Sequence, residues 1–180
     1  VARLAHLKGI AGTKLSFETQ AGIINAEVQN GVPKVKLTDP SAVKLNEKVI
    51  IDNREFVLDV VDTGVPHAVN FVDELASFDV FKWGRKIRWH ENYQPKGTNV
   101  DFVAVLDRHK LKVRTYERGV ENETLACGTG AVAAVLVAAQ RKLVNSPADV
   151  TVQSGEILRI YFTRQKESFR EIYLEGRVKI

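Results

Sequence analysis

One long apolar run dominates the pattern of hydrophobic and polar positions. All residues from Ala131 to Ala139 are apolar, and the helix that they predict, residues 128–143, has no polar stripe over more than two turns. A helix that is apolar all round must be covered on every side. Numerous predicted strands precede and follow it, so we expect a curled antiparallel sheet to wrap around this helix.

Alternation of apolar and polar residues predicts strands along most of the remaining chain. The predicted strands are residues 15–19, 23–28, 33–37, 49–52, 56–61, 68–72, 99–106, 110–116, 150–153, 157–163 and 171–176. Turns are expected at 20–22, 30–31 and 107–109. Residues 78–90 predict a second helix, and residues 1–9 read as the end of another, with Gly9 as its stop. Residues 39–41 are the best candidate for a linker.

Composition places the chain among globular proteins. Of its 180 residues 44% are hydrophobic and 27% are charged, which excludes a disordered, collagenous or fibrous protein. The single Cys excludes an internal disulfide framework and a multi-cysteine zinc site, and it indicates a reducing compartment, so we expect a cytoplasmic protein. The apolar run is too short to span a bilayer. We therefore expect no membrane partner. The net charge of +4 is spread along the chain and not clustered, so we expect no nucleic-acid partner either.

The first candidate for chemistry is Cys127, in the segment 124–130 (TLACGTG), just before the apolar helix. The helix dipole and nearby amides favour a thiolate at this position. The free N–H groups of Gly128, Thr129 and Gly130 would suit a carboxylate. The alternative is that Cys127 is a small buried hydrophobe, as most free cysteines are. Position and neighbours alone do not separate these two interpretations.

Four polar residues are weaker candidates, each with a structural alternative. Glu117 and Arg118 could bind the ammonium and carboxylate groups of an amino acid, or they could form a solvated turn. Asn99 could recognise a polar ligand or simply start a strand. His67 could tune or deprotonate a thiol, although a lone His is more often structural.

Three segments together resemble the diaminopimelate epimerase family. They are residues 62–69 (DTGVPHAV), 97–103 (GTNVDFV) and 116–130 (YERGVENETLACGTG), of which the last is the most specific. The resemblance implies an α/β (α+β) fold with two pseudo-symmetric domains, each a mostly antiparallel sheet curled around a central helix. It implies that residues 1–38 belong to the N-terminal domain, that 39–168 form the C-terminal domain with Cys127, and that 169–180 form a strand returning to the N-terminal domain.

The resemblance also implies a reaction. Members of the family convert LL-diaminopimelate to the meso isomer without pyridoxal phosphate, another cofactor or a metal, in lysine and peptidoglycan synthesis. One thiolate removes the α-proton while a second thiol protonates the opposite face. The N–H groups of Gly128 and Thr129 would stabilise the developing enediolate.

Positions in the resembling segments imply residue roles. Cys127 resembles the base of the forward reaction, and Gly128 and Thr129 resemble the backbone donors to the substrate carboxylate. The other implied positions are Glu117 toward the reacting ammonium, Arg118 and Asn99 toward the distal end, and His67 with Glu117 as the pair that adjusts thiol pKa values.

Two departures from the family pattern matter. Val65 stands where some members have an Asn that binds the distal end, and Val65 cannot donate that hydrogen bond. The partner cysteine is absent from the 180 residues, and by the resemblance it would precede Val1. We therefore expect this chain to hold half of the active site and to need an N-terminal segment. The family resemblance also implies a homodimer.

Three other functions stay open. A proline or hydroxyproline racemase would share the curled sheet and the Cys-Gly-Thr-Gly element, although Asn99 and the Glu117–Arg118 pair suit a longer substrate with a charged distal end. A thiol hydrolase would use Cys127 as nucleophile and His67 as base, and it needs only one Cys. The isolated 180 residues could also be an inert binding fragment.

Overall fold

The computed structural model describes residues 1–19, 22–166 and 168–178, and within them the chain forms one twelve-stranded sheet with few helices. The strand order is β1-β2-β3-β12-β11-β10-β8-β7-β6-β5-β4, with β9 added to β8. The strands are β1 Lys14–Thr19, β2 Gly22–Gln29, β3 Val32–Lys36, β4 Lys44–Ile51, β5 Arg54–Asp62, β6 Pro66–Phe71, β7 Asn99–Asp107, β8 Lys110–Glu117, β9 Asn122–Thr124, β10 Ala148–Thr151, β11 Ile157–Gln165 and β12 Ser168–Gly176.

The helices are α1 Ala2–Leu7, α2 Val80–Arg88 and α3 Gly128–Gln140, with short 3-10 turns at Leu75–Ser77 and Glu91–Tyr93. The predicted strands are therefore confirmed, and β9 and the two 3-10 turns are additions. The turn predicted at 20–22 falls partly on Gln20 and Ala21, which lie outside the described residues.

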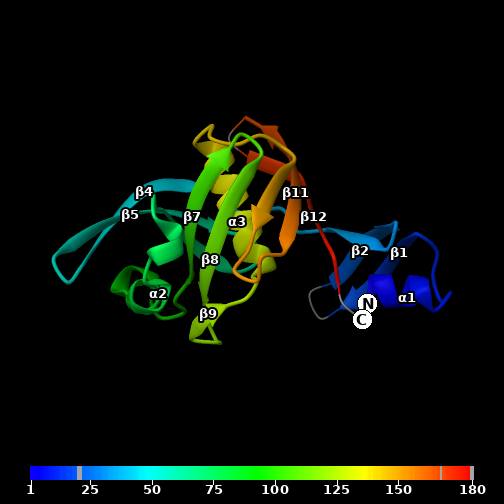
Figure 1. The fold of residues 1–180 in the computed structure, drawn as a ribbon, viewed down its shortest axis with the longest axis horizontal. Helices are drawn as coiled ribbons and strands as arrows, with labels where there is room; N and C mark the ends of the chain where they lie inside the picture. The colour runs from blue at the N-terminus through cyan, green and yellow to red at the C-terminus, as the bar shows by residue number, and fades with distance from the viewer. Residues whose placement is uncertain (20–21, 167, 179–180) are drawn as a thin grey trace.

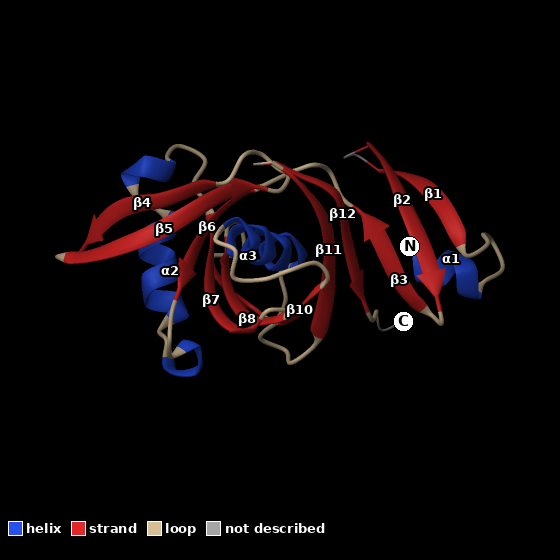
Figure 2. Ribbon diagram, turned by 90° about the horizontal axis from the view of Figure 1, so that it is seen from above, coloured by secondary structure: helices blue, strands red, loops and turns tan. Residues whose placement is uncertain are grey.

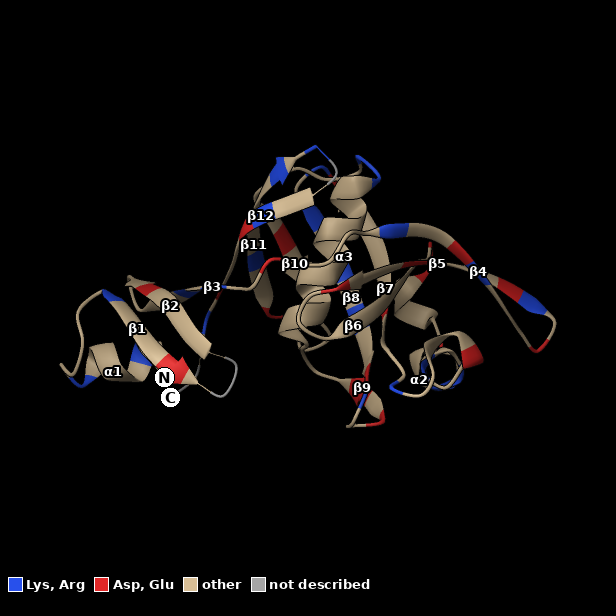
Figure 3. Cartoon of the chain, turned by 180° about the vertical axis from the view of Figure 1, so that it is seen from behind, with Lys and Arg blue, Asp and Glu red and all other residues tan. Residues whose placement is uncertain are grey.

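The sheet curls around α3, as the apolar run predicts (Figure 2). Every residue from Ala131 to Ala139 is buried, and α3 contacts strands β5 to β8 and β10 to β12. The helix carries no charged residue along its length (Figure 3). Parallel pairing of β6 with β7 and of β8 with β10 interrupts the otherwise antiparallel ladder. No helix of the described residues is long and apolar enough to cross a membrane.

The central helix ends earlier than its apolar pattern suggests. It stops at Gln140, and the predicted continuation to Leu143 is wrong. Lys142 adopts a left-handed backbone with φ of +60°, and its N–H donates to the carbonyl of Ala139. The N–H of Leu143 donates to the carbonyl of Ala138, which closes the last turn in the usual C-terminal manner.

A second core lies on the outer face of the sheet, under α2. Phe102 and Tyr116 are buried there against Ile87 of this helix. A Cβ atom on Gly84 would overlap the side chain of Tyr116, so this glycine allows α2 to lie close to β8. Strand β7 is thus covered on both faces, by α3 and by α2.

A smaller unit stands beside the curled sheet (Figure 1). In it α1 packs on β2 and β3, with Ala2, Ala26 and Val28 at the centre of a small core. It is joined to the larger unit through β12, which pairs with β11 on one side and with β3 on the other. The linker candidate at 39–41 lies in a stretch without regular structure between β3 and β4. The domain boundaries at 38 and 168 stay predictions.

Candidate active site

Cys127 occupies the N-cap position of α3, directly after the loop that follows β9. Its backbone is extended, with φ of −126°, and the residue is 7% exposed. The Sγ atom lies 3.5 Å from the hydroxyl oxygen of Thr129. The first turn of the helix, with Gly128 and Thr129, is only half-buried. The thiol and the free amides of the helix therefore lie together at the N-terminus of α3.

The environment of Cys127 keeps the thiol neutral. Burial raises its pKa to about 11, and the negative charges of Asp101 and Glu117 add to the effect. Hydrogen bonds from the Thr129 hydroxyl and the Gly130 amide act in the opposite direction but are outweighed. The helix terminus acts in the expected direction, because the Gly130 amide lowers the pKa of the thiol, but burial and two carboxylates outweigh it.

Asp101 is the centre of a buried polar cluster that sequence reasoning missed. Its Oδ2 atom lies 2.7 Å from Nδ1 of His67, and its Oδ1 atom accepts a hydrogen bond from the Thr115 hydroxyl at 2.7 Å. All three side chains are buried. The register of the strands explains the arrangement, because Asp101 on β7 lies opposite Thr115 on the neighbouring strand β8. His67 lies on β6, which runs parallel to β7.

Asn99 connects this cluster to the predicted substrate-binding loop. Its Nδ2 atom lies 3.4 Å from Nε2 of His67, and its Oδ1 atom accepts a hydrogen bond from the backbone N–H of Arg118 at 2.7 Å. Glu117, next to Arg118, is half-buried at the end of β8 and near enough to affect the pKa of Cys127. The structure thus brings Asn99, Glu117, Arg118 and His67 to one region beside Cys127.

Val65 also lies at this region. Its carbonyl accepts a hydrogen bond from the N–H of Thr63 at 3.1 Å, and the Thr63 hydroxyl donates to the carbonyl of Thr129 at 3.4 Å. The turn between β5 and β6 therefore contacts the first turn of α3. The apolar side chain of Val65 offers no hydrogen-bond donor at this turn.

Replacing Asp101 by asparagine is expected to make Cys127 more reactive. Removing the negative charge lowers the pKa of the thiol, and only the thiolate attacks iodoacetamide. In the unchanged protein the alkylation rate should rise about tenfold per pH unit from pH 7 to pH 10, as the thiolate fraction rises. Asp101→Asn should alkylate several-fold faster at pH 8, as measured by mass spectrometry.

The matched control is Asp149→Asn, which removes a carboxylate bound to Arg159 on β11. An electrostatic effect of Asp101 must vanish near pH 12, where the thiol is ionised in every variant. A rate difference that persists at that pH would mean that Asp101→Asn had only exposed the thiol.

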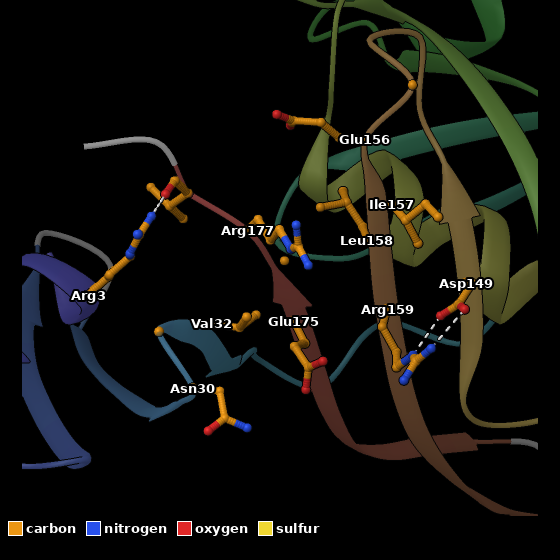
Figure 4. Close-up of a pocket in the computed structure, with 14 residues that line it drawn as sticks. Arg3, Asn30, Val32, Asp149, Glu156, Ile157, Leu158, Arg159, Glu175 and Arg177 are labelled. Atoms are coloured by element: carbon orange, nitrogen blue, oxygen red, sulfur yellow. Dashed lines mark hydrogen bonds and ion pairs between the residues drawn. The ribbon is translucent and has the colours of Figure 1, made fainter.

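A large cavity lies elsewhere, between the smaller unit and strands β10 to β12 (Figure 4). Its volume is about 1110 Å³, and Arg3, Asp149, Arg159 and Arg177 are among its lining residues. None of the predicted site residues lines it. Within the described ranges no group of three His, Cys, Asp or Glu side chains is arranged to hold a metal ion.

The curled sheet around a central helix is a fold that solved structures share. The structure resembles that of a hydroxyproline epimerase from Agrobacterium vitis with a TM-score of 0.76 at 16% identity, over 97% of this chain and 60% of the other. At this identity the likeness concerns the fold, an α+β architecture with a curled sheet around a central helix.

Sequence comparison identifies the family. The family model described as Diaminopimelate epimerase matches residues 60–180. The chain is 49% identical over 180 residues to the diaminopimelate epimerase of Aquifex aeolicus, covering 98% of this chain, and 44% identical over 179 residues to that of a Hydrogenobaculum species, covering 97%. The chain belongs to the diaminopimelate epimerase family. It spans 63% of the length of each of these two relatives.

Proposed function

We propose that the protein containing this chain is a cofactor-independent epimerase that interconverts LL- and meso-diaminopimelate, in lysine and peptidoglycan biosynthesis. The observation that carries the proposal is the thiol of Cys127 at the N-terminus of α3, beside the half-buried amides of the first turn and close to Glu117. Membership of the family supports this choice of substrate. A cytoplasmic location and a homodimer stay predictions.

The first turn of α3 supplies the electrostatic part of the proposed mechanism. The substrate carboxylate binds the N–H groups of Gly128 and Thr129, which the helix itself leaves unpaired. Removing the weakly acidic α-proton moves negative charge onto this carboxylate as an enediolate. The same N–H groups and the helix dipole stabilise that charge. Glu117 receives the reacting ammonium group.

Proton transfer uses Cys127 on one face of the α-carbon. The neutral thiol, with its pKa of about 11, is the acid form of this residue. It can protonate an enediolate directly, and it acts as the base of the forward reaction after losing its proton. His67 and Glu117 adjust this equilibrium, His67 through Asp101 and Glu117 through its charge.

The distal end of the substrate is assigned to Arg118 and Asn99. The Arg118 guanidinium binds the distal carboxylate, and the Asn99 amide, held between His67 and the Arg118 backbone, has a further N–H to offer. Val65 contributes no donor here, so this part of the site relies on Asn99, Arg118 and water.

The opposite face of the α-carbon requires a second thiol. The 180 residues contain one Cys, so we assign the second thiol to polypeptide outside this chain. The isolated chain should then bind substrate weakly and not invert it. This division fits a chain that spans 63% of its relatives' length.

Deuterium exchange tests the proposal. The product of the complete reading frame is incubated with LL-diaminopimelate in heavy water, and the recovered amino acid is examined by mass spectrometry and chiral chromatography. We expect one deuterium at the α-carbon of each inverted molecule, because the second thiol delivers a solvent-derived proton.

A parallel incubation with L-proline is the control for the racemase alternative, and we expect no exchange there. Exchange confined to proline would favour a proline racemase. Absence of exchange in both, with release of a hydrolysis product from a thioester probe, would favour the thiol hydrolase and overturn the epimerase proposal.

A further inference from the structure

The turn between β8 and β9, residues 118–121, is held closed by its own last residue. The N–H of Glu121 donates to the carbonyl of Glu117 at 2.8 Å, and the N–H of Gly119 donates to Oε1 of Glu121 at 3.1 Å. Glu121 adopts a left-handed backbone with φ of +58°, which is uncommon for a residue with a long side chain. The turn that presents Arg118 therefore depends on where the Glu121 carboxylate is fixed.

Arg88, at the end of α2, fixes that carboxylate. Its Nε and Nη2 atoms donate to Oε1 of Glu121 at 3.1 and 3.0 Å, and the Tyr116 hydroxyl approaches Oε2 at 3.5 Å. The side chain of Arg88 is 8% exposed and that of Glu121 is 37% exposed. Burial opposes ionisation of Glu121, but the Gly119 amide and Arg88 outweigh it and lower the pKa of this carboxyl.

Arg88 also packs against the segment that leads to Asn99. A Cβ atom on Gly97 would overlap Nη1 of Arg88 and lie 2.7 Å from its Cζ atom, so the absence of a side chain there makes room for the guanidinium. Gly97 has φ of +68°, which glycine adopts most readily. The Arg118 guanidinium reaches the same segment, with Nη1 donating to the carbonyl of Lys96 at 3.4 Å.

We propose that Arg88 and Glu121 are positioning residues that hold the 96–99 segment and the 118–121 turn in one arrangement, so that Asn99 and Arg118 are aligned for the distal end of the substrate. The inference rests on the proposed function, because it needs Asn99 and Arg118 to bind substrate. Neither Arg88 nor Glu121 has to touch the substrate, since their contacts run to the backbone and side chains of the two segments. A guanidinium–carboxylate pair with a buried guanidinium suits this task, because the planar donors of the guanidinium fix direction as well as distance.

Two conservative variants test the inference in the product of the complete reading frame. Arg88→Lys keeps the positive charge but replaces the planar guanidinium, which donates two hydrogen bonds, by a single ammonium. Glu121→Gln removes the negative charge but keeps an oxygen that accepts from the Gly119 amide. We expect KM for diaminopimelate to rise about tenfold in each variant, with kcat changed by less than about twofold. The reason is that contacts to the distal end of the substrate stabilise the ground state and the transition state equally.

Arg159→Lys is the matched control. Its guanidinium forms a comparable pair with Asp149 through two hydrogen bonds but contacts neither segment, so KM should stay unchanged. All assays are made at a temperature at which circular dichroism shows each variant fully folded. If Arg88→Lys does not fold, Glu121→Gln carries the test.

An unchanged KM in folded Glu121→Gln, or a fall in kcat at constant KM, would overturn the positioning role while leaving the proposed function intact. A wild-type protein that neither exchanges nor inverts diaminopimelate would instead overturn the proposed function, and this inference with it.

Discussion

Replacing Cys127 by alanine is expected to lower the rate of epimerisation by at least about a thousandfold, because a positioned proton donor or acceptor contributes factors of this order. The side chain lies at the N-terminus of α3, and it is the only thiol of the 180 residues. Thr129, the nearest hydroxyl, is a far weaker acid than a thiol. Inversion of LL-diaminopimelate by the product of the complete reading frame is the measurement.

The same variant distinguishes a two-thiol mechanism from any that uses one base. If the proposed second thiol is present, it can still remove and return a proton on its own face in this variant. Residual exchange in heavy water should then be confined to the D-centre of the meso isomer and proceed with retention. Exchange of the LL isomer at an undiminished rate would contradict the assignment of Cys127. Gln140→Ala, at the other end of the same helix, controls for a general effect on α3 and should leave turnover unchanged.

Replacing Gly130 by alanine is expected to destabilise the fold by about 2 kcal/mol. Gly130 lies in the first turn of α3, and a Cβ atom there would overlap Oδ1 of Asp101 and lie 3.0 Å from Oγ1 of Thr115. Alanine would favour the helix by up to about 1 kcal/mol, but displacing a buried carboxylate from its hydrogen bonds costs more. Denaturant unfolding at neutral pH measures the difference.

Gly12→Ala is the matched control, because a Cβ atom on Gly12 has no neighbour within 4 Å. Its free energy of unfolding should differ from that of the unchanged protein by less than about 0.5 kcal/mol. Equal stability of the two variants would show that Asp101 can move aside without cost, and that the cluster around it is less tightly packed than its distances indicate.

Periodicity alone predicted the architecture around the central helix well. The apolar run from Ala131 to Ala139 predicts a helix that is covered on all sides. The many strands predicted before and after it make a curled sheet the simplest structure that covers it. The end of the helix was predicted too late, because the apolar Leu143 continues the apolar pattern. The helix ends before it, since Lys142 adopts a left-handed backbone. A lysine at that position carries no strong stop signal.

The candidate site was predicted only in part, for a physical reason that β7 illustrates. Asn99, Val100, Asp101, Phe102 and Val103 are all buried, because α3 covers one face of this strand and α2 the other. The alternation of apolar and polar residues along β7 therefore does not show which polar residue points to the core, and it predicts that Asp101 is exposed. The signal that could have found it is an acidic residue inside a strand that is otherwise mostly apolar. Arg88 and Glu121 escaped because they are far apart in the sequence.

The pairing of β3 with β12 has a consequence for the chain while it is being synthesised on the ribosome. Most of the larger unit lies between these two strands in the sequence, so β3 is synthesised long before β12. Until then the backbone N–H and C=O groups on that edge of β3 have no partner strand. An unpaired edge is a template for intermolecular association. Pro33, Lys34 and Lys36 lie on that strand, and proline and lysine are residues that discourage such association. The composition of β3 thus limits such association until β12 has been synthesised.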